Sequence, residues 1–304
     1  MKRTLKRMKP YLPFYIMMVP GIIYLIINNY IPMAGLVVAF KKYSYAKGIW
    51  GSKWNGLENF RVFFNTDMMK VIVNTLGYNA VFIITSTVLS VAVAILINDI
   101  KGEKMKKLFQ TIFLVPHLIS IVIIAYLTYA FLAGETGFIN NSILPLFGKT
   151  PVSWYSSPKY WPFILVFVYL WKTFGYNAII YYATIAGIDP TYYEAASVDG
   201  AGIWTKIKSI TLSELKPTII TMTLMSIGRI FYSDFGLFYQ VPMNSGSLID
   251  ATQTIDTYIY RGLINNANIG MSSAACFVQS ILGFVLVLTS NWVVRRISRE
   301  NALF

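Results

Sequence analysis

Six long apolar runs are the feature that most constrains how this chain folds. A helix rises 1.5 Å per residue, so about 20 apolar residues are needed to cross the hydrocarbon core of a bilayer. Runs of that length predict six membrane-spanning helices, over residues 14–40, 73–97, 108–133, 161–188, 217–238 and 273–294. We therefore expect an all-α integral membrane protein with six transmembrane helices.

Composition supports the same class. Hydrophobic residues make up 56% of the chain and charged residues only 13%, whereas about a quarter of the residues of a soluble protein are charged. The net charge of +13 does not indicate nucleic-acid binding, because the basic residues cluster at the ends of the apolar runs and form no basic face interleaved with aromatic residues. One histidine and one cysteine leave no ligand set for a metal site and no disulfide framework.

Orientation follows from the basic residues in the loops, since lysine and arginine are retained on the cytoplasmic side. An N-terminus inside the cell places fifteen of them in the cytoplasm and nine outside, although the first outer loop is itself basic. We expect a cytoplasmic segment at 1–13, a six-helix transmembrane domain at 14–294 and a cytoplasmic tail at 295–304. The first run exceeds the length of a signal peptide's apolar region, so it is expected to stay as a helix, bent at Pro20 or Pro32.

A polar insert at residues 189–213 separates the fourth and fifth runs. Asp189 is placed to cap a helix whose first position is Pro190, where a missing N–H group costs nothing. Residues 200–202 are glycine-rich and break that helix. A second short helix should then present an apolar stripe formed by Ile203, Ile207 and Ile210. The insert is predicted to be a cytoplasmic helix-turn-helix.

In this insert, Glu194, Ala195 and Ala196 are followed by Gly200, Ile210 and Leu212 at fixed spacings. With these residues the insert resembles the EAA loop of permease subunits in binding-protein-dependent ABC importers. That pattern reads EAA, three residues, glycine, nine residues and I-x-L-P, and Ser213 stands where it has its final proline. The resemblance implies that residues 189–213, hereafter the coupling loop, dock on a cytoplasmic ATPase, with Glu194 as a contact and Gly200 at the turn. The implied docking residues are Glu194, Ala195, Ala196, Asp199, Gly200, Ile210 and Leu212.

The same resemblance implies the partners. They are a second, homologous permease subunit in a heterodimer, two cytoplasmic ATPase subunits that bind ATP and Mg²⁺, and an extracellular lipid-anchored or periplasmic sugar-binding protein. No cofactor is expected in this chain and it is not expected to be an enzyme. Residues 148–150 resemble the end of a phosphate-binding loop, but Ile143 stands where that motif needs glycine.

Two outer segments extend the resemblance to carbohydrate permeases that import oligosaccharides released from polysaccharides. They are the first outer loop, residues 41–71, and residues 252–263. Trp50, Trp54 and Phe60 in the first loop fit either an aromatic belt at the membrane interface or a contact with the sugar-binding protein. The implied function is ATP-driven oligosaccharide import across the plasma (inner) membrane of a bacterium. Lysine and asparagine usage points to a Gram-positive source.

Three ionisable residues lie inside the predicted spans, where charges are costly and mark candidate functional sites. Aromatic and amide neighbours accompany them, and this combination suits a sugar, because its C–H faces stack on rings while its hydroxyl groups need hydrogen-bond partners. We predict a translocation path along the fourth and fifth spans, although an ion-pair or subunit-contact role is equally open. The path residues are Tyr169, Lys172, Tyr176, Asn177, Arg229, Tyr232 and Asp234, with Ser233 on the same predicted face as Arg229.

Two other classes of protein fit the sequence less well. A secondary transporter driven by an ion gradient would need coupling carboxylates near the membrane midplane, and Asp234, the one carboxylate inside a predicted span, is placed off it. A membrane-embedded enzyme would need a nucleophile, base or metal set, which the sequence does not offer. Whether the oligosaccharide is acidic or neutral stays open.

Overall fold

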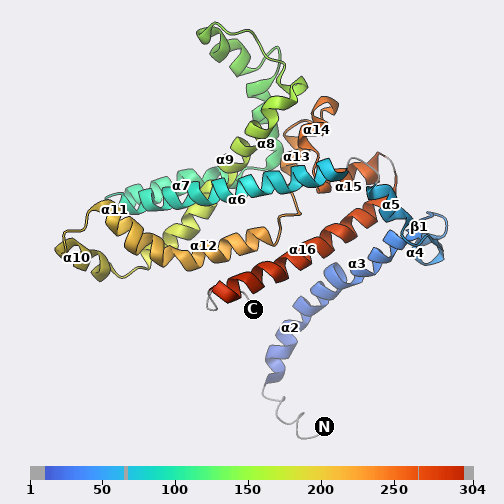
Figure 1. Cartoon of the computed structure of the whole chain (residues 1–304), viewed down its shortest axis with the longest axis horizontal. Coiled ribbons are helices and arrows are strands. Elements are labelled where there is room, and N and C mark those ends of the chain that lie inside the picture. The colour runs from blue at the N-terminus through green and yellow to red at the C-terminus, as the bar shows by residue number, and fades with distance from the viewer. Residues whose placement is uncertain (1–10, 65–67, 266, 298–304) are drawn as a thin grey trace. The chain divides into compact units, whose positions relative to one another are not determined.

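A computed structural model describes residues 11–64, 68–265 and 267–297, which are mainly helical (Figure 1). The chain forms two compact units. The first unit comprises residues 1–66 and 259–278, and the second comprises residues 67–258 and 279–304. Most of the predicted cytoplasmic segments 1–13 and 295–304 lies outside the described residues.

The first unit begins with one helical stretch that is long and apolar enough to cross a membrane. Pro20 lies inside α2, and the helix changes to π geometry at Ile26, ahead of Pro32. The stretch comprises α2 (Leu12–Leu25), η2 (Ile26–Tyr30), α3 (Ile31–Met33) and η3 (Ala34–Phe40).

A small hairpin follows directly and is fastened to the end of that stretch. The Asn59 amide donates hydrogen bonds to the carbonyl oxygens of Ala39 (2.8 Å) and Lys41 (2.9 Å). Phe40 stacks on Trp54 at 5.6 Å between ring centroids and packs on Phe60 at 5.1 Å. These contacts hold residues 41–64 against the end of the first helical stretch. The elements of this segment are β1 (Lys41–Lys42), α4 (Gly48–Gly51), β2 (Lys53–Trp54), which pairs antiparallel with β1, and α5 (Glu58–Phe64).

Two long helices, α6 (Met68–Asp99) and α9 (Trp161–Ala186), pack together in the second unit. Both confirm predicted spans. Phe82 on α6 and Leu165 on α9 are almost fully buried with Phe238 of the short helix α13 (Phe235–Gln240). Each large apolar side chain buried in this way stabilises the fold by about 1.5–3 kcal/mol where water is the alternative. A second cluster joins the opposite ends of α6 and α9 to α12 (Leu212–Ile227).

The predicted third span is not one straight helix. Helices α7 (Glu103–Leu118) and α8 (Ile121–Leu132) meet at an angle of 92°. Pro116 lies in the last turn of α7, where it removes one helical hydrogen bond, and Ile119 adopts an extended backbone that ends the helix. The two halves therefore run in different directions.

The predicted fifth span is also interrupted, so the expectation of one helix over 217–238 is wrong. Helix α12 ends at Ile227, residues 228–234 form a turn, and Asp234 caps α13 by accepting a hydrogen bond from the Leu237 amide at 3.1 Å. Asp234 therefore begins a new helix at a point where the apolar run predicts a continuous one.

Four continuous helical stretches in the described part of the chain are long and apolar enough to cross a membrane, and the bent α7–α8 pair would make a fifth. The four are Leu12–Phe40, Met68–Asp99, Pro158–Ala186 and Ile269–Arg296. The predicted total of six stays a prediction. The elements not yet bounded are α10 (Pro190–Val198), α11 (Ile203–Lys206), η8 (Ile207–Thr211), η4 (Ile139–Ile143), η5 (Leu144–Phe147), η6 (Trp154–Ser156), η7 (Pro158–Tyr160), η9 (Gly246–Leu248), α14 (Ile249–Thr252), α15 (Ile255–Ile264) and α16 (Ile269–Ile297).

Candidate functional site

The first helix of the coupling loop, α10, begins as its sequence predicts. Asp189 is the N-cap and accepts a hydrogen bond from the Thr191 amide at 2.9 Å, while Pro190 occupies the first helical position. Hydrogen bonds from the backbone and side chain of Thr191 lower the pKa of the Asp189 carboxyl below its ordinary value of 3.8. The carboxylate thus stays charged where the helix N-terminus favours a negative group.

The turn after α10 explains why a glycine stands at position 200. Gly200 has a φ of +75°, in the left-handed region that side chains disfavour. The Ala201 amide donates to the Ala196 carbonyl at 2.9 Å, and the Gly200 amide donates to the Ser197 carbonyl at 3.1 Å. These two bonds satisfy carbonyl groups at the helix end in the Schellman arrangement.

The second helix of the coupling loop is a helical turn, a π-helical turn and then α12, with no break between them. Ile207 and Ile210 are half-buried, but Ile203 is 60% exposed, so the predicted apolar stripe begins only at Ile207. Ser213 lies inside α12. The helix therefore continues through the position where the EAA pattern has its final proline.

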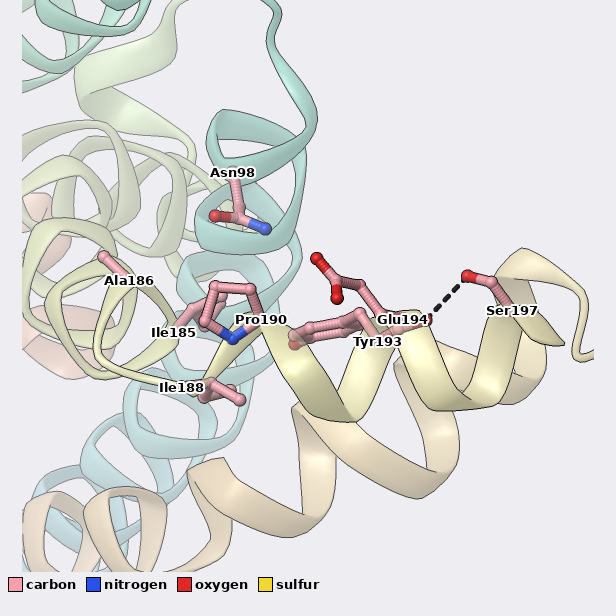
Figure 2. Close-up of a pocket in the computed structure, with 8 residues that line it drawn as sticks. All are labelled: Asn98, Ile185, Ala186, Ile188, Pro190, Tyr193, Glu194 and Ser197. Carbon is pink, nitrogen blue, oxygen red and sulfur yellow. Dashed lines mark hydrogen bonds between the residues drawn. The ribbon is translucent and has the colours of Figure 1, made fainter. Parts of the chain in front are cut away.

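Side-chain hydrogen bonds join the two helices of the coupling loop. The hydroxyl groups of Tyr193 and Thr211 are 2.9 Å apart. The Lys206 ammonium donates to Ser197 Oγ at 2.6 Å, and Ser197 Oγ donates in turn to the Tyr193 carbonyl, the bond dashed in Figure 2. The loop is therefore a folded unit with its own internal contacts.

A cavity of about 350 Å³ lies where α10 meets the ends of α6 and α9. Glu194 on α10 and Asn98 on α6 both line it (Figure 2). Glu194 is exposed and has no hydrogen bond or ion pair with any residue that the structure describes. An unpaired carboxylate on an exposed helix is suited to contact a partner. The remaining lining residues are Ile185, Ala186, Ile188, Pro190, Tyr193 and Ser197.

The other predicted docking residues are spread over the coupling loop. Ala195, Asp199 and Gly200 are exposed beside Glu194, at the end of α10. Ala196, Ile210 and Leu212 are half-buried. The predicted docking residues therefore divide into an exposed group at the end of α10 and a half-buried group.

The predicted path residues on α9 already have partners inside the protein. Tyr169 stacks on Phe82 at 3.9 Å, and Tyr176 stacks on His117 at 4.5 Å. Each ring thus has one face covered, which leaves less of it for a sugar. Asn177 is half-buried on the same helix.

Lys172 fastens α9 to the bend between α7 and α8. Its ammonium donates to the carbonyl oxygen of Ile119 at 2.6 Å and to that of His117 at 3.4 Å. Both carbonyls lie where α7 ends and have lost their helical partners. The charge is thereby satisfied within the fold.

The interrupted fifth span is held by carboxamide groups from other helices. The Asn79 amide on α6 donates to the carbonyl oxygens of Ile230 (2.8 Å) and Tyr232 (2.9 Å), and the Gln279 amide on α16 donates to that of Phe231 (2.7 Å). Three successive carbonyls freed by the turn are therefore satisfied. Without these hydrogen bonds, each carbonyl group left buried and unpaired would cost about 1–3 kcal/mol of folding free energy.

Asp256 of α15 also holds the turn, through Ser233. Its Oδ2 accepts hydrogen bonds from the Ser233 amide at 2.6 Å and the Ser233 hydroxyl at 2.9 Å. Sequence reasoning missed Asn79, Asp256 and Gln279. A carboxamide inside an apolar run was the available signal for Asn79 and Gln279, whereas Asp256 was assigned to an outer segment.

The turn changes the placement of Arg229, Tyr232 and Asp234. All three are exposed. Because residues 228–234 are not helical, the prediction that Arg229, Tyr232 and Ser233 share one helical face is wrong. The turn instead presents Arg229 and Asp234 at its two ends.

Comparison with known proteins decides the family. Residues 86–299 match the family described as binding-protein-dependent transport system inner membrane component. The chain belongs to this family. The matched part of the permease includes α9, the coupling loop and α12.

Two individual relatives are similar to this permease over nearly its whole length. Protein LplB of Bacillus subtilis (strain 168) is 32% identical over 94% of this chain and 90% of its own length. The polygalacturonan/rhamnogalacturonan transport system permease protein YteP of the same organism is 30% identical over 99% of this chain and 93% of its own length.

A solved structure also matches nearly the whole permease. It is that of a bacterial ABC transporter involved in the import of the acidic polysaccharide alginate. The matching chain is 32% identical, has a TM-score of 0.89, and the match covers 97% of this chain and 99% of that one. The permease therefore shares its fold with this solved relative over nearly the whole chain.

Proposed function

We propose that the chain is the transmembrane permease subunit of an ATP-driven ABC importer that takes up oligosaccharides. The observation that carries the proposal is the coupling loop, which presents the unpaired Glu194 on an exposed helix and joins directly to α12. Family membership and the named transport systems of the relatives support it. Six spans, with the third bent and the fifth interrupted, would place both termini in the cytoplasm of a bacterium, by composition a Gram-positive one.

The proposed assembly contains a second homologous permease, two ATPase subunits that hold ATP and Mg²⁺, and an extracellular sugar-binding protein. One solved relative is described in complex with an alginate pentasaccharide-bound periplasmic protein, which supports the last of these. In this chain the hairpin exposes Trp50 (77%) and Trp54 (65%), whereas Phe60 packs inward on Phe40. The two tryptophans are the proposed contacts for the sugar-binding protein.

The proposed translocation path shifts from α9 to the turn at 228–234. Arg229, Tyr232 and Asp234 remain exposed there, whereas Lys172 is occupied by backbone carbonyls. An arginine and a carboxylate at the two ends of one turn offer both a donor and an acceptor to sugar hydroxyl groups. Tyr169, Tyr176 and Asn177 would contribute only their uncovered surfaces.

The docking proposal is tested by copurification. The tagged chain is expressed with its neighbouring genes, and the wild type is compared with Glu194→Arg and with Glu103→Arg. Glu103 is an exposed acid at the start of α7, so the second variant carries the same charge change outside the coupling loop. We expect an ATPase and a second permease to copurify with the wild type and with Glu103→Arg, and the ATPase to be lost from Glu194→Arg.

Two results would contradict the proposal. Equal ATPase recovery with Glu194→Arg and Glu103→Arg would remove Glu194 from the docking contact. A wild-type chain that purifies alone and remains monomeric would favour a secondary transporter driven by an ion gradient.

A further inference from the structure

The coupling loop contains a connection that the docking role of Glu194 does not explain. Tyr193 precedes Glu194 on α10, is half-buried, and its hydroxyl lies 2.9 Å from the hydroxyl of Thr211. Thr211 is 4% exposed and is the last residue of the π-helical turn η8. We propose that these two hydroxyl groups form a clasp that passes displacement of α10 into α12, so that Tyr193 and Thr211 are positioning residues for transport.

The π-helical turn accounts for the position of Thr211. A π turn closes i→i+5 hydrogen bonds and holds one more residue than an α turn, so it rotates the side chains that follow it. Isolated π turns inside α-helices recur at functional positions. Here the turn ends at Thr211, and the Thr211 hydroxyl is the group in the second helix that meets Tyr193.

The other links between the two helices are weaker. The covalent connection runs through residues 199–202, with Gly200 in the left-handed region. The bond from Lys206 to Ser197 is exposed to solvent, where an ammonium group exchanges readily with water and contributes little to rigidity. The half-buried clasp is therefore the contact that best fixes α10 against the second helix.

Beyond the clasp, α12 is anchored to the membrane helices. Leu215, one turn after Thr211, is fully buried in a cluster with Ala94 of α6 and Tyr181 of α9. The Thr184 and Thr218 hydroxyl groups lie 3.1 Å apart and join α9 to α12 a little further along. Movement of Thr211 must therefore move packed helices and not a free loop.

The far end of α12 leads to the turn at 228–234. In Figure 1, α10 and α11 lie at one end of α12, and the chain leaves the other end through this turn toward α13. The 16 residues of α12 span roughly 24 Å at 1.5 Å per residue. A shift applied at Thr211 would thus reach Ile227, two residues before Arg229, along one helix. This part of the inference rests on the proposed function.

The clasp itself is tested without any partner protein. Tyr193→Phe and Thr211→Val each remove one hydroxyl group and keep the side-chain shape. Tyr192→Phe is the matched control, because Tyr192 is the neighbouring tyrosine and is exposed on the same helix. In the purified chain we expect about fivefold faster amide hydrogen exchange in residues 190–211 for the first two variants, from loss of one hydrogen bond, and no change for the control. The double variant should exchange no faster than either single one.

Transmission is tested in the copurified assembly. A bimane label on Ser226→Cys, in a Cys276→Ser background, reports from the exposed last turn of α12. We expect ATP with Mg²⁺ to change its fluorescence in the wild type and in Tyr192→Phe. The change should fall severalfold in Tyr193→Phe and Thr211→Val, while the ATPase still copurifies.

These outcomes distinguish the existence of the clasp from its role in transmitting movement to α12. Unchanged exchange in Tyr193→Phe, or effects of the two single variants that add, would overturn the clasp whatever the chain transports. Faster exchange with an undiminished ATP response would overturn its role in transmission. If no ATPase copurifies with the wild type, the importer assignment fails, and the exchange result still decides whether the clasp exists.

Discussion

Lys172 shows how a charged side chain is accommodated within a long apolar helix. A charge inside a membrane span is costly, and Lys172 offsets that cost with the two carbonyl oxygens that the α7–α8 bend leaves free. The same ammonium therefore satisfies its own charge and the backbone at the bend. Its role in this fold is to hold the bend against α9, and the exposed Arg229 is the better candidate for contact with a sugar.

The Asp189 cap makes the stability of α10 depend on pH. Because its pKa is lowered in the folded protein, the charged cap stabilises α10 above the ordinary value of 3.8, and this contribution is lost as the pH falls through the lowered value. We expect Asp189→Ala to speed amide exchange in the first turn of α10 severalfold at neutral pH. Asp189→Asn keeps an oxygen acceptor and should lose protection less.

A titration of the Asp189 carboxyl by NMR checks the sign. The midpoint should lie below the ordinary value of 3.8, and protection of the first turn of α10 in the wild type should fall over the same pH range. A midpoint above that value, or Asp189→Ala exchange equal to wild type at neutral pH, would show that the cap does not hold the helix.

Residue-level features differ in how far the sequence reveals them. Asp189, Pro190 and Gly200 act on backbone groups only a few residues away, so their roles could be read from local spacing. Asn79 donates to carbonyls some 150 positions further along the chain. No local pattern identifies such a partner, because the carbonyl becomes available only when another helix unwinds.

At the scale of elements, α7 and α9 approach each other at Gly175. A Cβ atom at this position would clash with the carbonyl oxygen and the carbonyl carbon of Phe113. Both neighbours are backbone atoms, so they cannot move aside as the end of a flexible side chain does. Glycine at 175 is thus a requirement of this helix crossing.

Gly175→Ala is therefore expected to destabilise the second unit. Overpacking of this kind costs about 1–3 kcal/mol or more, which should lower the thermal unfolding temperature of the purified chain by several degrees. Gly77→Ala is the matched control, because Gly77 lies inside α6 with nothing within 4 Å of an added Cβ. That variant should be neutral or slightly stabilised. Equal unfolding temperatures for the two variants would refute the close crossing.

The unbroken elements could be predicted and the broken ones could not. Where an apolar run coincides with one helix, as in α6, α9 and α16, hydropathy alone located the span. The bend after α7 keeps an apolar composition, so hydropathy continues across it. The turn at 228–234 does contain Arg229, Ser233 and Asp234, but three polar residues within a long run do not by themselves indicate that the helix ends. Both depend on polar groups of other helices, Lys172 in one case and Asn79 with Gln279 in the other.

At the scale of the whole molecule, α12 connects two regions with different proposed roles. One end adjoins the coupling loop with Glu194 and the Tyr193–Thr211 clasp, and the other adjoins the turn that exposes Arg229 and Asp234. The sequence indicated both ends, the first through the EAA pattern and the second through its ionisable residues. It did not indicate the clasp or the interruption that makes α12 a separate helix.

Uptake into proteoliposomes tests the proposed ATP-driven import most directly. The copurified assembly is reconstituted with its sugar-binding protein on the outer side and ATP with Mg²⁺ on the ATPase side. A labelled mixture of uronate and neutral oligosaccharides serves as the probe. We predict accumulation that requires hydrolysable ATP and persists when ionophores collapse the proton and sodium gradients. Accumulation by the chain alone, driven by such a gradient without ATP, would contradict this function.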